Sequence, residues 1–136
     1  MSQAYPELAP YVRELKSRLG VQAVVVFGSR ARGDDLPTSD YDLVVVSTGL
    51  RGLDRLERRD RLYGIWDDVG PDADADIFGL TPEELHGLGS PMLWDALEEG
   101  RVIVDDGTWR AAKAEFDRRK AAGLITPIEG GWRIRP

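Results

Sequence analysis

Asp40 and Asp42 are separated by a single residue, and they lie where a polar loop runs into the apolar segment DLVVVS at 42–47. In an extended strand, residues i and i+2 point to the same face about 7 Å apart, so the two carboxylates would lie side by side. Like charges at this spacing repel each other unless a cation lies between them, and Mg²⁺ prefers such oxygen ligands. Aspartates also occur at loop ends because they form turns. The pair alone therefore fits a metal site or an ordinary turn.

A glycine and a serine, Gly28 and Ser29, directly follow the apolar run QAVVVF at 22–27. A glycine at the end of a buried strand lets the backbone approach a ligand closely. If a helix begins at Ser29, the free N–H groups of its first turn and the Ser29 hydroxyl would favour a phosphate. The alternative is a plain strand-to-helix turn in which Ser29 caps the helix. The pair predicts a phosphate-binding turn only if other features of the sequence support it.

A third acidic segment, DADIF at 74–78, again places aspartates at the start of an apolar run. Asp74 and Asp76 would share one face of a strand, and we favour Asp76 because Ile77 and Phe78 continue directly from it. Three carboxylates on adjacent strands can hold two metal ions about 3.5–4 Å apart, as in phosphoryl and nucleotidyl transfer. The candidate catalytic and metal-binding residues are Asp40, Asp42 and Asp76.

The elements that must position these residues alternate between strands and helices. Helical spacing of apolar residues and helix-start signals, such as Thr81 before Pro82, predict helices, and short β-branched runs predict strands. The predicted helices are 7–19, 29–33, 53–66, one from 81, 91–99 and 108–122, and the predicted strands are 22–27, 42–47, 74–80 and 101–104. A hairpin is expected around Gly130-Gly131. This alternation predicts an α/β (α+β) fold with a central sheet flanked by helices.

The length of 136 residues corresponds to one domain. We expect a catalytic domain over 1–106, and a helix and hairpin over 107–136 that form an appendage on the same domain. The net charge of −6 argues against bulk electrostatic binding of nucleic acid. With no cysteine and one histidine, His86, a metal site would have to use oxygen ligands. No signal peptide or membrane-length apolar run is visible, so we expect a cytoplasmic protein without membrane contact.

Charged and aromatic side chains outside the motifs have simpler interpretations. The arginines of 51–61 could hold RNA or an acidic partner, but we expect a solvated face offset by near-neighbour pairs with Asp54, Glu57 and Asp60. Trp66 and Trp94 are expected in the core. Trp109 and Trp132, in the C-terminal segment, are also expected to pack in the core, although exposure of both would mark a contact surface.

The segment GSRARGDDLPTSDYDL at 28–43 resembles the signature of the nucleotidyltransferase superfamily typified by DNA polymerase beta. The pattern is Gly-Ser, ten residues and Asp-x-Asp, and Gly28-Ser29 is followed by ten residues and then Asp40-Tyr41-Asp42. The third aspartate of the family matches Asp76. The resemblance covers roughly residues 8–104 and leaves 108–136 outside.

The resemblance implies a role for each matched residue. Asp40 and Asp42 would ligate Mg²⁺ in a two-metal site, and Asp76 would ligate the catalytic metal and help to deprotonate the nucleophile. Gly28 and Ser29 would hold the triphosphate of an NTP, with ATP expected. Arg32 would add charge there, or it is a solvated loop arginine.

The chain is barely longer than the catalytic core, and in this it resembles the minimal nucleotidyltransferases often encoded beside a helical HEPN protein. In such pairs the HEPN protein is a toxin, and the transferase is an antitoxin that in some cases moves AMP from ATP onto a toxin tyrosine. The resemblance therefore implies an NTP substrate and a HEPN partner. Two alternatives stay open: a small-molecule acceptor, or a non-catalytic module that caps a partner protein.

Overall fold

The computed structural model describes residues 5–33 and 40–135. The longer helices alternate with the strands in the predicted order, and two short 3₁₀ turns, η1 (Pro6–Leu8) and η2 (Thr48–Leu50), are additional. The α-helices are α1 (Ala9–Leu19), α2 (Ser29–Arg32), α3 (Arg55–Val69), α4 (Pro82–His86), α5 (Pro91–Glu99) and α6 (Thr108–Ala121). The strands are β1 (Val21–Phe27), β2 (Tyr41–Ser47), β3 (Ala75–Leu80), β4 (Arg101–Asp105), β5 (Ile125–Ile128) and β6 (Gly131–Ile134).

Local sequence explains where several of these elements begin. Asp54 caps α3 and Thr81 caps α4, each in a reciprocal capping box with the glutamate three residues later. Ser90 caps α5 by accepting from the N–H of Leu93. The β-branched run of β1 favours an extended chain. These capping signals fix where α3, α4 and α5 begin.

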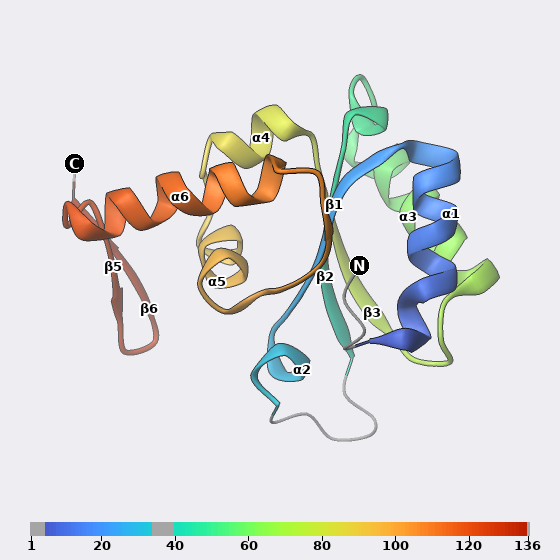
Figure 1. The fold of residues 1–136 in the computed structure, drawn as a ribbon, viewed down its shortest axis with the longest axis horizontal. Helices are drawn as coiled ribbons and strands as arrows, with labels where there is room; N and C mark the ends of the chain where they lie inside the picture. Colours follow the sequence, from blue (N-terminus) through green and yellow to red (C-terminus); the bar gives the residue numbers. More distant parts are fainter. Residues whose placement is uncertain (1–4, 34–39, 136) are drawn as a thin grey trace.

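The main sheet has four strands in the order β3-β2-β1-β4. β1 pairs antiparallel with both β2 and β4, whereas β2 and β3 are parallel. Helices cover both faces, with α1 and α3 on one side and α4, α5 and α6 on the other (Figure 1). This mixed, helix-flanked sheet confirms the predicted fold class.

The period of two along each strand divides the core into two layers. Val24 and Val26 of β1 pack with residues of α1 and α3, and Val25 packs with residues of α5 and α6. In β2, Leu43 and Val45 belong to the first layer. A side chain at an even position of β2 therefore faces α4, α5 and α6.

Three of the four tryptophans lie in the core, as predicted, and the fourth packs at its edge. Trp66, Trp94 and Trp109 are 6%, 5% and 3% exposed. Trp132 of β6 is half-buried and makes edge contacts with Trp94 and Phe116, at ring-centre distances of 5.9 and 5.7 Å. Its indole N–H also donates to Asp95 at 2.8 Å. These contacts dock the hairpin onto α5 and α6.

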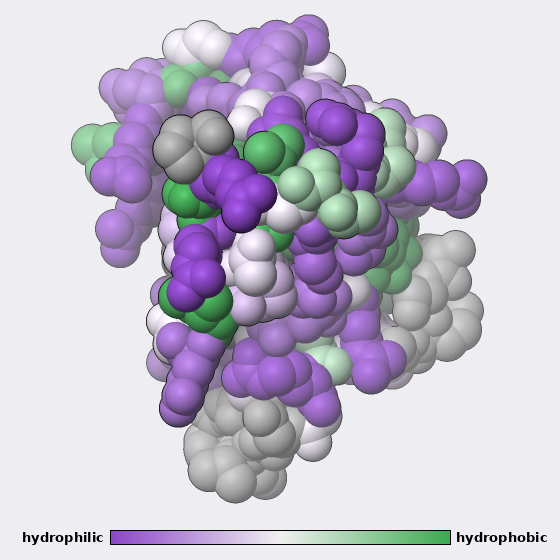
Figure 2. Space-filling view, turned by 90° about the vertical axis from the view of Figure 1, so that its left-hand side faces the viewer, coloured by the Kyte–Doolittle hydropathy of each residue, from purple (hydrophilic) through white to green (hydrophobic). Residues whose placement is uncertain are grey.

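The molecular face on the side of α6 and the hairpin is mostly hydrophilic (Figure 2). Its hydrophobic side chains form small, separated spots rather than one patch. Ile128 and Ile134 are the exposed large hydrophobic residues among the described part of the hairpin. Among the described residues, no helix combines the length and apolar character that crossing a bilayer requires.

The arginines of 51–61 differ from expectation in their partners. Within the described chain, the ion pairs of this segment run to α4 rather than along α3. Arg51 pairs with Glu83, and Arg58 pairs with Glu84 at 2.6 Å. The near-neighbour pairing that we expected is therefore wrong. Arg58 reaches Glu84 past the end of β3, where its Nη1 also donates to the Gly79 carbonyl at 3.4 Å.

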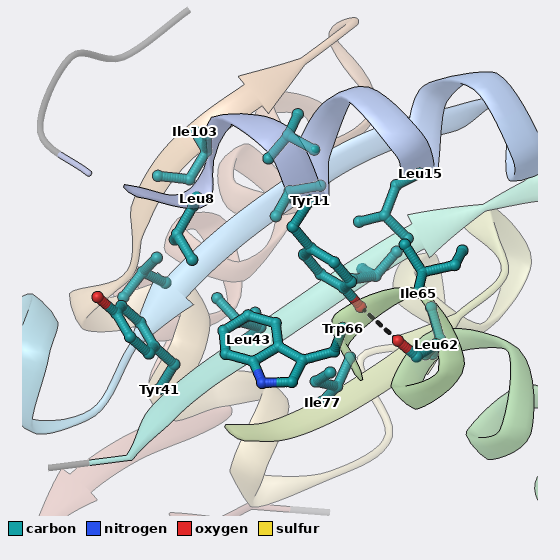
Figure 3. Close-up of a cluster of buried hydrophobic side chains, with 14 of the residues drawn as sticks. Leu8, Tyr11, Leu15, Tyr41, Leu43, Leu62, Ile65, Trp66, Ile77 and Ile103 are labelled. Carbon is teal, nitrogen blue, oxygen red and sulfur yellow. Dashed lines mark hydrogen bonds between the residues drawn. The ribbon is translucent and has the colours of Figure 1, made fainter. Parts of the chain in front are cut away.

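We predict that Tyr11→Phe lowers the free energy of unfolding by about 1 kcal/mol, because it removes one buried hydrogen bond. The Tyr11 side chain is fully buried against Trp66, and its hydroxyl donates to the Leu62 carbonyl at 2.9 Å (Figure 3). Burial keeps the pKa of this phenol far above its usual value, so it stays a donor. Urea unfolding measures the loss, and an unchanged midpoint would contradict this role for the hydroxyl.

Candidate functional site

Asp42 and Asp76 are paired neighbours on the two parallel strands. The β2–β3 register matches Asp42 with Asp76, and the β1–β2 register matches Phe27 with Asp42. Both aspartates lie on the sheet face that packs against α4, α5 and α6, because the residues that follow them, Leu43 and Ile77, belong to the opposite layer. Adjacent strands are about 4.8 Å apart, so the two carboxylates come close together.

The choice of Asp76 over Asp74 agrees with this register. Asp74 precedes β3, and its carbonyl accepts the N–H of Tyr41 at 2.9 Å. Asp40 lies just before β2 and is exposed. Tyr41 between the two aspartates is 3% exposed, as expected of a residue that points to the core. The start of β2 therefore turns Asp40 and Asp42 away from the Tyr41 side.

Gly28 brings the glycine–serine turn into contact with Asp42. It has φ 73° and ψ −154°, a backbone conformation that glycine alone adopts without strain. A Cβ built at Gly28 would lie 2.2 Å from Oδ2 of Asp42, far inside van der Waals contact. The absence of a side chain at this position therefore allows the Asp42 carboxylate to lie against the turn.

Ser29 is the first residue of α2, and Gly28 occupies the cap position without a side-chain cap hydrogen bond. The interpretation of Ser29 as the N-cap is therefore wrong. The N–H groups of Ala31 and Arg32 donate to the Gly28 carbonyl at 3.1 Å and hold the short helix. Residues 34–39, between the turn and Asp40, lie outside the described residues.

Glu99, the last residue of α5, is a member of this site that sequence analysis missed. Its Oε1 accepts from the N–H of Gly28 at 3.2 Å and from Nη1 of Arg32 at 2.9 Å. Arg32, for which a phosphate-binding role and a solvated one were both considered, therefore turns toward the site. Glu99 looked like an ordinary helix-end acid before Gly100, and no local pattern connected it with a glycine 71 positions earlier.

Negative charge accumulates around Asp42. Burial raises the pKa of this carboxyl above its ordinary value, and the charges of Asp76 and Asp40 raise it further. Arg32 opposes the rise, and Glu99 adds to it. A cation bound among these carboxylates would relieve the repulsion.

The donor set fits Mg²⁺ in chemistry, because the carboxylates of Asp42 and Asp76 are hard oxygen ligands on paired strand positions. In the described part of the chain, no group of three or more Asp, Glu, His or Cys side chains is arranged so that it could hold a metal ion. The roles of Asp40, Asp42 and Asp76 as metal ligands therefore stay a prediction.

A hollow of about 700 Å³ opens beside Asp76 along the outer edge of β3. One wall comes from α3 and carries arginines and Tyr63, and the other comes from β3 and α5, with Phe78 and Met92. Tyr63 accepts the N–H of Ile77 at 2.9 Å, so α3 holds this edge of the sheet in place. The hollow leaves space for a second reactant next to Asp76.

A mixed sheet with a glycine–serine turn against a pair of aspartates is the arrangement expected of a nucleotidyl-transferring domain. Comparison with known families agrees, since the model of the nucleotidyltransferase domain matches residues 8–125. The chain belongs to this family. The match continues through α6, so our estimate that the resemblance ends near residue 104 is wrong. The physical reason is that α6 contributes Trp109, Ala112 and Phe116 to the core.

Several solved structures share the fold. A chain from a toxin–antitoxin complex with AMP-PNP is 16% identical with a TM-score of 0.59, covering 84% of this chain and 87% of that one. A chain from the Shewanella oneidensis complex of a tri-AMPylated HEPN toxin with an MNT antitoxin is 14% identical with a TM-score of 0.60, covering 90% of each. No match was found among the curated proteins.

Proposed function

We propose that this chain transfers AMP from ATP to a hydroxyl group of a protein partner, in a metal-dependent reaction, as the antitoxin of a HEPN toxin–antitoxin pair. The observation that carries the proposal is the contact between the turn at Gly28 and the Asp42 carboxylate, with Asp76 beside it in register. The proposal takes this turn to hold the phosphates and the aspartates beside it to hold the metal.

The reaction needs little covalent chemistry from the protein. The acceptor oxygen forms a bond to the α-phosphorus, the bond from that phosphorus to the oxygen bridging to the β-phosphate breaks, and pyrophosphate leaves with the electron pair. The hydroxyl proton passes to Asp76, which lines the hollow where the acceptor would enter. Asp40, Asp42 and Asp76 would hold Mg²⁺, which supplies charge neutralisation on the phosphates when it is bound.

The proposed partner rests on the similar structures. One of them contains AMP-PNP, an ATP analogue, and another pairs an MNT antitoxin with an AMPylated HEPN toxin. The hollow beside Asp76 is also within the size range of small-molecule sites, about 300–1,000 Å³, which favours a small hydroxylated acceptor as the second candidate.

We expect intact-mass measurement to show that a HEPN protein encoded beside this chain gains one or more AMP groups when the two are incubated with ATP and Mg²⁺. Chelation of the metal should stop the gain, because the phosphate charge is then not neutralised. Transfer to small hydroxylated compounds without the HEPN protein would support the second candidate. Tight complex formation without a mass gain from any NTP would point to a non-catalytic capping module.

A further inference from the structure

We infer that Glu99 competes with the nucleotide for the phosphate-binding groups of the site and thereby weakens nucleotide binding. The inference rests on the proposed function, because it takes Gly28 and Arg32 as groups that bind the triphosphate. One oxygen of Glu99 accepts from the N–H of Gly28 at 3.2 Å and from Nη1 of Arg32 at 2.9 Å.

The competition follows from the number of donors. A backbone N–H has one hydrogen and serves one strong acceptor, so a phosphate oxygen can use the Gly28 N–H only when Glu99 has left it. The Glu99 carboxylate carries the same sign of charge as the phosphate. It therefore also repels a phosphate that approaches Arg32 or the turn.

The surrounding backbone restricts the displacement to the Glu99 side chain. The N–H of Gly100 donates to the Ala96 carbonyl at 2.8 Å, and a Cβ built at Gly100 would lie 2.6 Å from Cγ1 of Val25 in β1. The helix end is thus packed too closely to shift. The Glu99 side chain is 26% exposed and can rotate toward solvent.

The turn does not depend on Glu99 for its position. Nε of Arg101 donates to the Ala31 carbonyl at 2.8 Å and ties α2 to the start of β4. Gly33 N–H donates to the Ser29 carbonyl at 3.0 Å and closes the short helix from within. Removal of the Glu99 carboxylate should therefore release the Gly28 N–H for a phosphate oxygen and leave the arrangement of the turn intact.

The test is a calorimetric titration of the full chain with AMP-PNP and Mg²⁺. We expect Glu99→Gln and Glu99→Ala to bind AMP-PNP about tenfold more tightly than the wild type, since a charge-assisted hydrogen bond no longer has to be broken. Glu98→Gln is the matched control. It removes the same charge from the neighbouring position, but Glu98 pairs with Lys120 of α6, so the affinity should change by less than about twofold.

Unchanged or weaker binding by both Glu99 variants, with thermal unfolding like that of the wild type, would overturn the inference and leave the proposed function standing. An equal gain in Glu98→Gln would also overturn it, because net charge rather than the contact would then set the affinity. If neither the wild type nor any variant binds AMP-PNP, the proposed function and the inference both fail. Tight binding by the Glu99 variants alone would support the inference most directly.

Discussion

Asp42→Asn is expected to lower the rate of AMP transfer by at least about a hundredfold while the protein stays folded. The substitution keeps the size of the side chain and removes one of the two carboxylates that the β2–β3 register places side by side. An amide oxygen is a much weaker ligand for Mg²⁺ than a carboxylate. Single-turnover transfer, followed by intact mass, measures the loss.

The same substitution should not destabilise the nucleotide-free protein. The pKa of Asp42 is raised by burial and by the charges of Asp76 and Asp40, so its ionised form is less favourable in the folded chain than in the unfolded one. An acid with a raised folded pKa contributes stability below its unfolded pKa, near 3.8, and this contribution disappears as the pH rises through the folded value. At pH 7 the variant should therefore unfold at an equal or higher denaturant concentration, and its advantage should shrink toward pH 4.

Asp74→Asn is the matched control for Asp42→Asn. Asp74 is an exposed aspartate directly before β3, and among the described residues its contact with β2 is made by its backbone carbonyl. Its loss should change transfer by less than about twofold, because it lies outside the register pair. Equal losses of transfer in the two variants would mean that the overall negative charge of this region, rather than the position of Asp42, supports the reaction.

The positions of the motif residues in the fold could be predicted because their information is local. Strand β2 follows from its β-branched run, and the period of two then places Asp42 and Val44 on one face and Tyr41 on the other. Asp76 could be chosen over Asp74 because the apolar residues that follow it mark the strand. The fixed spacing from Gly28 to Asp40 added what neither short motif carries by itself.

The remaining parts of the site could not be predicted because they depend on packing between distant segments. Glu99 meets Gly28 only because α5 ends against the turn, and helix ends rich in glutamate are common on surfaces. The pairing of Arg58 with Glu84 depends in the same way on where the two helices lie on either side of the outer strand β3. Near-neighbour rules for helices favour partners four residues apart and do not foresee such tertiary pairs.

Gly28→Ala is expected to lower transfer by at least about a hundredfold and the free energy of unfolding by about 2–3 kcal/mol. Two costs combine at this position. The φ of 73° is strained for alanine, and the new Cβ would lie 2.2 Å from Oδ2 and 3.1 Å from Cγ of Asp42. Phe27 and Asp42 are partners in the β1–β2 pairing, which holds the two backbones in place. The Asp42 side chain therefore has to move its carboxylate away from the turn.

The two costs can be separated with variants of the same chain. Gly20→Ala imposes a smaller strain, because its φ of 58° and ψ of 52° lie in the left-handed helical region, and nothing lies within 4 Å of a built Cβ. It should cost about 1 kcal/mol, a lower limit for the backbone strain at Gly28, and leave transfer unchanged. In Gly28→Ala combined with Asp42→Ala, the clashing Oδ2 and Cγ atoms are absent, and the two Cβ atoms would lie 3.4 Å apart, an ordinary contact.

Denaturant unfolding of the two single variants and the double variant forms a double-mutant cycle. We expect the double variant to be more stable than the sum of the single effects allows, because the clash between the introduced methyl group and the Asp42 carboxylate exists only when both groups are present. Additive effects would mean that strain at Gly28 explains its whole cost. The turn and the carboxylate would then be neighbours without being fitted to each other, and the physical basis for one site at this sheet end would be lost.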